Sequence, residues 1–126
     1  MKKLLLTLLV PFLLSTSSAW AEWVWVTSGD RTDLYIDPAT IRKDGNLVKV
    51  WEINDLKQRH KDGELSSRSR TEYDCKEERY RTLSFSVHSE SMANGELIYN
   101  TSSVSPWQDV PPDTAVASIM KKVCVK

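Results

Sequence analysis

The feature that most constrains this chain is its pair of cysteines, Cys75 and Cys124, the only two among 126 residues. A cysteine thiol can act as a nucleophile, bind a metal or form a disulfide. A metal site would need another cysteine or histidine at close spacing, and Cys75 has none. A catalytic thiol would need an activating base, for which only His60 and His88 are available. The choice among the three roles depends on the compartment in which the protein folds.

The N-terminal sequence predicts export from the cytosol. Two lysines precede an apolar run over residues 4–14, and an Ala-Trp-Ala sequence follows it. The run is shorter than the roughly 20 apolar residues of a membrane-spanning helix. We therefore expect a signal peptide over residues 1–21, cleaved after Ala21 or, as a second choice, after Ala19. Because no cysteine lies at this junction, we expect a periplasmic or secreted protein that is neither a lipoprotein nor otherwise anchored to a membrane.

Export favours a disulfide, because two cysteines in a small secreted domain usually pair. The bond would join positions that are 49 residues apart. In the chain-entropy model, closing a loop of this size stabilises a protein by about 4 kcal/mol. Total stabilities are about 5–15 kcal/mol, so this contribution is large for a small domain. We predict a Cys75–Cys124 disulfide, and rank it ahead of a metal site or a catalytic thiol.

Length and charge limit the classes of protein to consider. Removal of the signal peptide leaves residues 22–126, enough for one domain. The whole chain has 17 basic and 17 acidic residues, and two lysines leave with the signal peptide, so the remaining net charge is −2. A nucleic-acid-binding domain usually carries a strongly basic surface. The charge balance therefore argues against nucleic acid as the partner.

Alternating apolar residues predict an antiparallel sheet. The alternation is clearest over residues 80–89, where Leu83, Phe85 and Val87 are expected to point inward. A single helical turn is expected at residues 38–41, and Asn94-Gly95 indicates a hairpin. The expected strands are residues 23–26, 34–37, 47–55, 69–75, 80–89 and 97–101.

The C-terminal segment predicts a helix over residues 114–124. Asp113 or Thr114 can cap its N-terminus, and apolar residues recur along it at helical spacing. Because Cys124 ends this helix, a bond to Cys75 would pin the helix to the sheet. The predicted fold is α+β: a single antiparallel sheet of about six strands, a C-terminal helix packed on it and one disulfide. The apolar stripe consists of Val116, Ile119, Met120 and Val123.

The tryptophans have two expected roles. Trp51 and Trp107 are expected to fill the core. Trp23 and Trp25 share one face of the first strand, which is expected at an edge of the sheet. These two side chains either pack in the core, the favoured interpretation, or form a dimer surface, because aromatic residues are enriched at interface centres.

The sequence contains no motif that predicts an enzyme. It has no Gly-x-Ser-x-Gly, His-Glu-x-x-His or Cys-x-x-Cys sequence, and only four glycines, which argues against nucleotide binding. Ser86 and His88 share one strand face and could form a hydrolytic pair, although a hydrated strand surface explains them better. We therefore expect no catalytic residues, no metal and no cofactor.

A polar segment with an excess of basic residues is the first candidate for binding. Residues 56–70 are expected to form the exposed tip of a hairpin, where the cations face only Asp62 and Glu64. Such a projection could bind an acidic protein patch or a sulfated polysaccharide. A hairpin that is merely well hydrated is the simpler interpretation. The cations are Lys57, Arg59, Lys61, Arg68 and Arg70.

A series of landmarks resembles the surface-adhesin protein E family of Gram-negative bacteria. The landmarks are spread over residues 23–124, so the resemblance covers nearly the whole chain after the signal peptide. No single motif is decisive, but their order is fairly specific. In sequence, they are WVWV, YIDPATIRKDGNLVKVWEINDLK, EYDCKEERYRTLSF, GELI, SPWQDVPPDT and the VC at residues 123–124.

The resemblance implies an antiparallel sheet with a C-terminal helix, a cell-envelope location and a tendency to form homodimers. It also implies binding to host matrix and serum proteins, such as vitronectin, laminin and plasminogen. The leading hypothesis is an exported, non-enzymatic envelope protein that acts by protein–protein binding. The alternative is a periplasmic housekeeping protein, such as an inhibitor or assembly accessory, with a bacterial partner.

Overall fold

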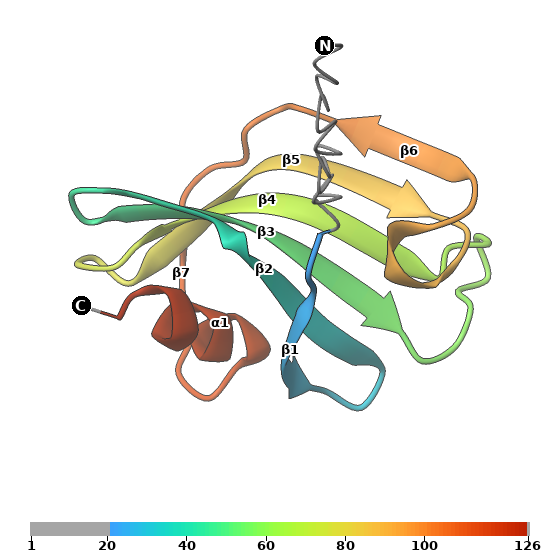
Figure 1. Ribbon diagram of the computed structural model, residues 1–126, viewed down its shortest axis with the longest axis horizontal. Coiled ribbons are helices and arrows are strands. Elements are labelled where there is room, and N and C mark those ends of the chain that lie inside the picture. The colour runs from blue at the N-terminus through green and yellow to red at the C-terminus, as the bar shows by residue number, and fades with distance from the viewer. Residues whose placement is uncertain (1–20, 126) are drawn as a thin grey trace, which may run out of the picture.

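The computed structural model describes residues 21–125 as one curved antiparallel sheet with a single α-helix on one face (Figure 1). This arrangement confirms the predicted α+β fold. The predicted signal peptide lies outside the described residues, apart from Ala21. The elements are β1 (Val24–Ser28), β2 (Thr32–Asp44), β3 (Leu47–Leu56), β4 (Ser66–Asp74), β5 (Arg79–His88), the 3-10 helix η1 (Ser91–Ala93), β6 (Leu97–Thr101), β7 (Gln108–Asp109) and α1 (Ala115–Val123).

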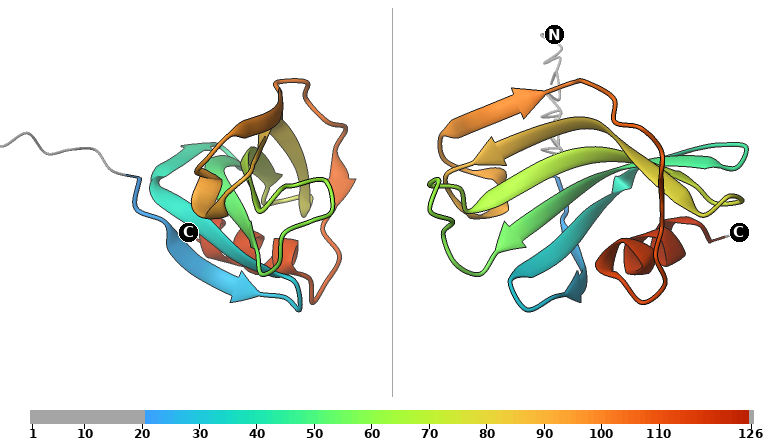
Figure 2. Two further views of the ribbon diagram at one scale, coloured as in Figure 1. Left: turned by 90° about the vertical axis from the view of Figure 1, so that its right-hand side faces the viewer. Right: turned by 180° about the vertical axis from the view of Figure 1, so that it is seen from behind.

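The order of the strands in the sheet follows their order in the chain from β1 to β6. Every neighbouring pair is antiparallel, so the sheet is a meander of successive hairpins. Short β7 pairs with β5 at Arg79 and Tyr80, whereas β6 pairs with the opposite end of β5, from Phe85 to His88. The sheet therefore has β1 at one edge and β6 and β7 at the other, as the two views of Figure 2 show.

Residues 38–41 form a bulge within β2, and the expected helical turn is wrong. The register with β3 shifts between Asp37 and Arg42. A carboxylate oxygen of Asp37 accepts a hydrogen bond from the N–H of Ala39 at 3.1 Å, and the Thr40 hydroxyl donates to the Asp37 carbonyl at 2.7 Å. These local bonds satisfy polar groups within an extended chain, so no helical turn is required.

The core lies between the sheet and α1, near the edge formed by β1 and β2. Side chains on one face of β2, β3 and β4 meet the apolar side of the helix, as predicted from its stripe. The sheet contributes a β-branched and aromatic surface, whereas the helix contributes residues one turn apart. The buried cluster consists of Ile36, Val48, Val50, Tyr73, Ile119 and Val123.

Helix α1 is short and is fixed at both ends. The Thr114 hydroxyl caps it by accepting a hydrogen bond from the N–H of Ala117 at 3.2 Å. Lys121 and Lys122 lie in the last turn, where positive charge favours the helix dipole. Helices of nine residues are marginal in isolation, so this one depends on its contacts with the sheet. No helix within residues 21–125 is long and apolar enough to cross a bilayer.

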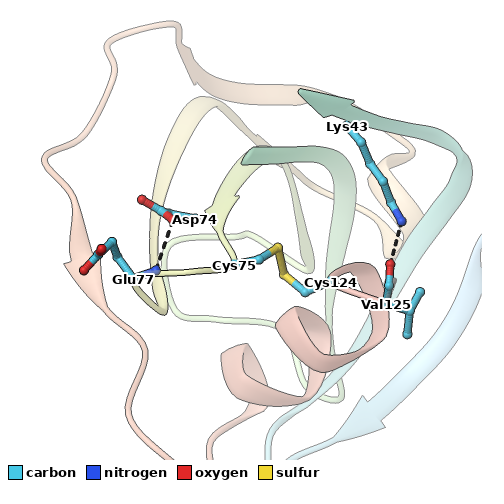
Figure 3. Close-up of a disulfide and its surroundings, with 6 residues drawn as sticks. All are labelled: Lys43, Asp74, Cys75, Glu77, Cys124 and Val125. Carbon is cyan, nitrogen blue, oxygen red and sulfur yellow. Dashed lines mark hydrogen bonds between the residues drawn. A yellow bond between two sulfur atoms is a disulfide. The ribbon is translucent and has the colours of Figure 1, made fainter. Parts of the chain in front are cut away.

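The predicted disulfide is confirmed: Cys75, just after β4, bonds to Cys124 at the end of α1 (Figure 3). The Cα atoms of the two cysteines are 5.7 Å apart. The backbone N–H of Cys75 also donates to the carbonyl of Asn46 at 2.8 Å, and Lys43 Nζ donates to the Val125 carbonyl at 2.7 Å. Covalent and polar contacts therefore hold the C-terminal segment against the β2–β3 end of the sheet.

Trp51 and Trp107 lie outside the core, contrary to expectation. Both are partly buried and stack under arginines on the sheet. The guanidinium of Arg68 lies 4.2 Å from the Trp51 ring centroid, and those of Arg79 and Arg81 lie 4.6 and 4.4 Å from that of Trp107. An arginine over an aromatic ring shields it from water through cation–π contact. The sheet face that α1 leaves uncovered is therefore built from charged and aromatic side chains together.

Of the three β5 residues that were expected to point inward, only one is buried. Val87 is 6% exposed, whereas Leu83 and Phe85 remain partly exposed. Leu83 falls where the register between β4 and β5 shifts, and α1 packs chiefly on β1 and β2. The short helix cannot cover the whole sheet, so inward-facing residues of β5 lack a covering layer.

Replacing both cysteines by serine should lower the free energy of unfolding by about 4 kcal/mol, because the 49-residue constraint on the unfolded chain is lost. Urea unfolding of the oxidised wild type and of the C75S/C124S variant would measure the difference. Reduced wild-type protein is the matched control and should resemble the variant. Equal unfolding midpoints for all three proteins would show that the disulfide does not stabilise the fold.

Candidate functional site

A broad groove lies where the β1–β2 turn meets the β3–β4 loop. Its volume is about 920 Å³, and its wall is formed by residues 30–32 and 56–61. The N–H of Lys57 donates to the carbonyl of Arg31 at 2.9 Å, and the N–H of Leu56 donates to the carbonyl of Leu65 at 2.9 Å. Backbone hydrogen bonds thus hold the two connections together and fix the shape of the groove.

The groove gathers part of the predicted basic segment and separates the rest. Lys57, Arg59 and Lys61 of the predicted segment line it, and so does Asp30. Arg68 and Arg70 lie on β4 instead. Arg68 stacks on Trp51, and Arg70 lies opposite this tryptophan in the register of β3 and β4. The five cations are therefore not one surface, because strand β4 carries two of them away from the loop.

The structure adds Arg31 to the groove, and sequence reasoning missed it. Arg31 is exposed and lies in the β1–β2 turn, about 26 residues before Lys57. His60 also lines the groove, 3.6 Å from the carboxylate of Glu64. The sequence around Arg31 gives no indication that this residue lies near Lys57. Only the pairing of β2 with β3 brings the two residues to the same groove.

Arg59 has a different role from the other groove cations. Its guanidinium donates to the carbonyl of Gly63 at 2.9 Å and to the carbonyl of Ser89, and it contacts the Glu90 carboxylate at 3.3 Å. Arg59 thereby ties the β3–β4 loop to the segment after β5. Within residues 21–125, Arg31, Lys57 and Lys61 form no ion pair, so these three remain available to a partner.

Ser86 and His88 do meet on β5, at 2.8 Å between the hydroxyl oxygen and Nε2. Burial and the nearby charge of Arg68 lower the pKa of His88, which favours the neutral imidazole. Within residues 21–125, no carboxylate is hydrogen-bonded to the other ring nitrogen. The pair thus has the nucleophile and base of a triad without the acid that orients the base, and the arrangement does not define a hydrolytic site.

Two buried carboxylates on the face away from α1, Glu72 and Asp74, are paired with basic side chains. Glu72 contacts Arg81 at 2.7 Å and Lys49 at 3.9 Å. Asp74 accepts hydrogen bonds from the N–H of Glu77 at 3.1 Å and from Arg79 at 3.1 Å. The backbone bond is the main reason that the pKa of Asp74 is lowered. These carboxylates already have partners within the protein, so they are not free to bind a ligand. No group of three or more potential metal ligands occurs within residues 21–125.

Glu52 is partly buried and faces the side of the sheet that carries α1. The hydroxyl of Tyr73 donates a hydrogen bond to its carboxylate. Burial raises the pKa of Glu52 to about 7, despite opposing hydrogen bonds from Tyr73 and Thr71. Glu52 forms no ion pair within the described part of the chain. Sequence reasoning assigned it only to a strand face, since burial depends on where α1 packs.

The fold is that of a small, disulfide-bonded antiparallel sheet with one helix, and a groove lined by basic side chains lies at one end of the sheet. A family model described as surface-adhesin protein E matches residues 23–125. The chain therefore belongs to this family, which confirms the resemblance seen in its sequence.

Two solved structures share the fold. The structure of Haemophilus influenzae protein E is 14% identical, with a TM-score of 0.62 over 83% of this chain and 85% of that chain. Crystal form II of the same protein is 14% identical, with a TM-score of 0.59 over 79% and 91% of the respective chains. No curated protein sequence matches the chain significantly. At this identity, the structural likeness shows the fold alone.

The stability of the protein should depend on the ionisation of Glu52. Because its folded pKa of about 7 lies above its unfolded value of 4.5, the unfolded state loses its proton first as pH rises, and stability falls between these values. Between pH 5 and 8, the wild type should lose about 2.5 kcal/mol relative to Glu52→Gln. Urea unfolding at several pH values would measure this difference, and parallel pH profiles would contradict the assignment. Glu96→Gln, which removes an exposed carboxylate, is the matched control.

Proposed function

We propose that this protein is an exported, non-enzymatic protein of the cell envelope that acts as an adhesin, and that it binds an acidic protein partner through the basic groove. The observation that carries the proposal is the convergence of Arg31, Lys57 and Lys61 on one groove without ion-pair partners in the described residues. Membership of the surface-adhesin protein E family supports the adhesive role.

The groove has the physical properties of a recognition surface. Backbone hydrogen bonds and the side chain of Arg59 already hold the loop that forms the groove. Binding should therefore cost little conformational entropy. Its cations are exposed, so they act mainly on the rate and specificity of association. Their effect should weaken as salt rises, because the screening length is about 10 Å at 0.1 M ionic strength.

A host matrix or serum protein with an acidic segment fits both the charge of the groove and the family. A periplasmic partner of the same chemistry would instead support a housekeeping role inside the envelope. Both roles use one binding surface, and they differ in where the partner is found. The groove supports binding as the activity in either case, and family membership favours adhesion.

Reversing two groove charges should weaken binding at least tenfold at 50 mM salt, which corresponds to about 1.4 kcal/mol. The test is surface plasmon resonance with immobilised vitronectin and laminin, comparing the wild type with Lys57→Glu/Lys61→Glu at 50 and 300 mM salt. The deficit should shrink at the higher salt concentration, because the interactions are between exposed charges.

The matched control is Lys76→Glu/Lys121→Glu, which makes the same change of charge at exposed positions outside the groove. This control should bind as the wild type does. Equal losses in both double variants would attribute binding to net charge, and unchanged binding in the groove variant would remove the groove from the proposal.

We also propose that the chain forms a homodimer through its exposed sheet edge at β6. Leu97, Ile98 and Tyr99 are 52%, 44% and 56% exposed, and β6 pairs with β5 on one side only within residues 21–125. An apolar edge strand with unpaired backbone groups favours association with another strand.

Charges on this edge should shift the protein toward monomer. Leu97→Lys/Tyr99→Lys should raise the dissociation constant of the dimer at least tenfold, because lysine side chains block edge pairing. Sedimentation velocity over a concentration series measures the constant. Trp25→Lys, which alters the opposite edge strand, is the control, and a greater effect from this variant would place the interface at β1.

A further inference from the structure

A second hollow lies between the first turns of α1 and the sheet. Its volume is about 160 Å³, which leaves room for several waters or one small organic molecule, since a water occupies about 30 Å³ in the liquid. Val116 and Ile119 line it from the helix, whereas β3, β4 and β5 supply polar side chains. It shares no lining residue with the basic groove.

The sheet side of this cavity is polar: a carboxylate and an amide lie there among the hydroxyl groups of serine, threonine and tyrosine side chains. Glu52 contributes a carboxylate, and Asn54 contributes a side-chain oxygen that is buried without a hydrogen-bond partner in the described residues. The hydroxyls of Tyr73 and Thr71 donate hydrogen bonds to the Glu52 carboxylate, but neither carries a positive charge. Polar atoms that are buried in proteins nearly always find partners, so the orphaned oxygen of Asn54 indicates a missing donor.

The cavity also lacks positive charge. No lysine, arginine or histidine is among its lining residues, and the other titratable groups that face Glu52 are the phenols of Tyr73 and Tyr80. From α1, only apolar side chains reach it. A carboxylate in such a place is stabilised by a cation brought from outside, since an opposite charge at close range favours the ionised form.

We propose that the cavity binds a small organic cation with a protonated primary amine. The ammonium group donates hydrogen bonds to the Glu52 carboxylate, and it has three donors for this purpose. The alkyl part of the ligand contacts Val116 and Ile119. A metal ion fits less well, because one carboxylate and one amide oxygen supply too few charged oxygen ligands.

Three probes of matched shape test the proposal: propylammonium, propanol and propionate. Each is titrated into the purified, disulfide-bonded protein, and amide chemical shifts are followed by NMR. Propylammonium should cause saturable shifts around the cavity, and its two counterparts should not. Its affinity should be about tenfold higher at pH 8 than at pH 6, because a group with a pKa of about 7 is about one-tenth ionised at pH 6 and nine-tenths at pH 8.

Two variants address different parts of the site. Glu52→Gln keeps the shape of the side chain and removes its charge, so affinity should fall at least tenfold and the pH dependence should disappear. Val116→Phe fills the cavity from the helix while keeping the polar groups, and should abolish the saturable shifts. Glu96→Gln should leave binding unchanged, since this carboxylate is exposed and lies outside the cavity.

The outcomes separate this cavity from the basic groove. Equal saturable shifts with all three probes would mean that the cavity does not select a cation, and no saturable shifts with any of them would mean that it holds water only. Either result would overturn the proposal. Undiminished propylammonium binding in Val116→Phe would place the cation elsewhere, whether or not Glu52→Gln folds. Vitronectin binding is measured on the same variants, and its persistence would show that the groove functions independently.

Discussion

The disulfide between Cys75 and Cys124 is the constraint on which the rest of the structure depends. Helix α1 has only nine residues, and its buried surface is largely Ile119 and Val123. Such a helix is too short to be stable alone, and it covers only part of the sheet. The covalent bond fixes its C-terminal end beside β4, so the apolar residues meet the core at little further entropic cost. The polar cavity then lies where the first turns of the helix reach the sheet.

The two faces of the sheet are stabilised by different interactions. Beneath α1, β-branched and aromatic residues are buried in the usual way. On the other face, Arg68, Arg79 and Arg81 stack on tryptophans, and two of them pair with buried carboxylates. Long arginine side chains cover apolar surface while their charged ends stay hydrated. This explains how a sheet with one short helix keeps its uncovered face ordered.

The candidate binding features are placed where they do not disturb this framework. The basic groove is built from connections at the end of the hairpins, and its cations are exposed. The polar cavity lies under the helix, among residues that are held in place by the disulfide and the core. Loops can vary in sequence at small cost to the fold, whereas cavity residues are coupled to packing. The groove therefore fits recognition of a large partner, and the cavity fits a small ligand.

The sequence by itself determined six of the strands in outline, the apolar stripe of the helix and the pairing of the two cysteines, because these depend on local periodicity and on having only one partner. It also indicated the family. It did not give the length of β2, which continues to Asp44 although a strand over residues 34–37 was expected, or the short strand β7. It did not determine that residues 38–41 bulge, that Trp51 and Trp107 lie under arginines, or that Arg31 joins Lys57 and Lys61. The tertiary structure decided these points, because strand register sets which distant residues become neighbours. The burial of Glu52 was decided in the same way, by the position at which a short helix stops covering the sheet.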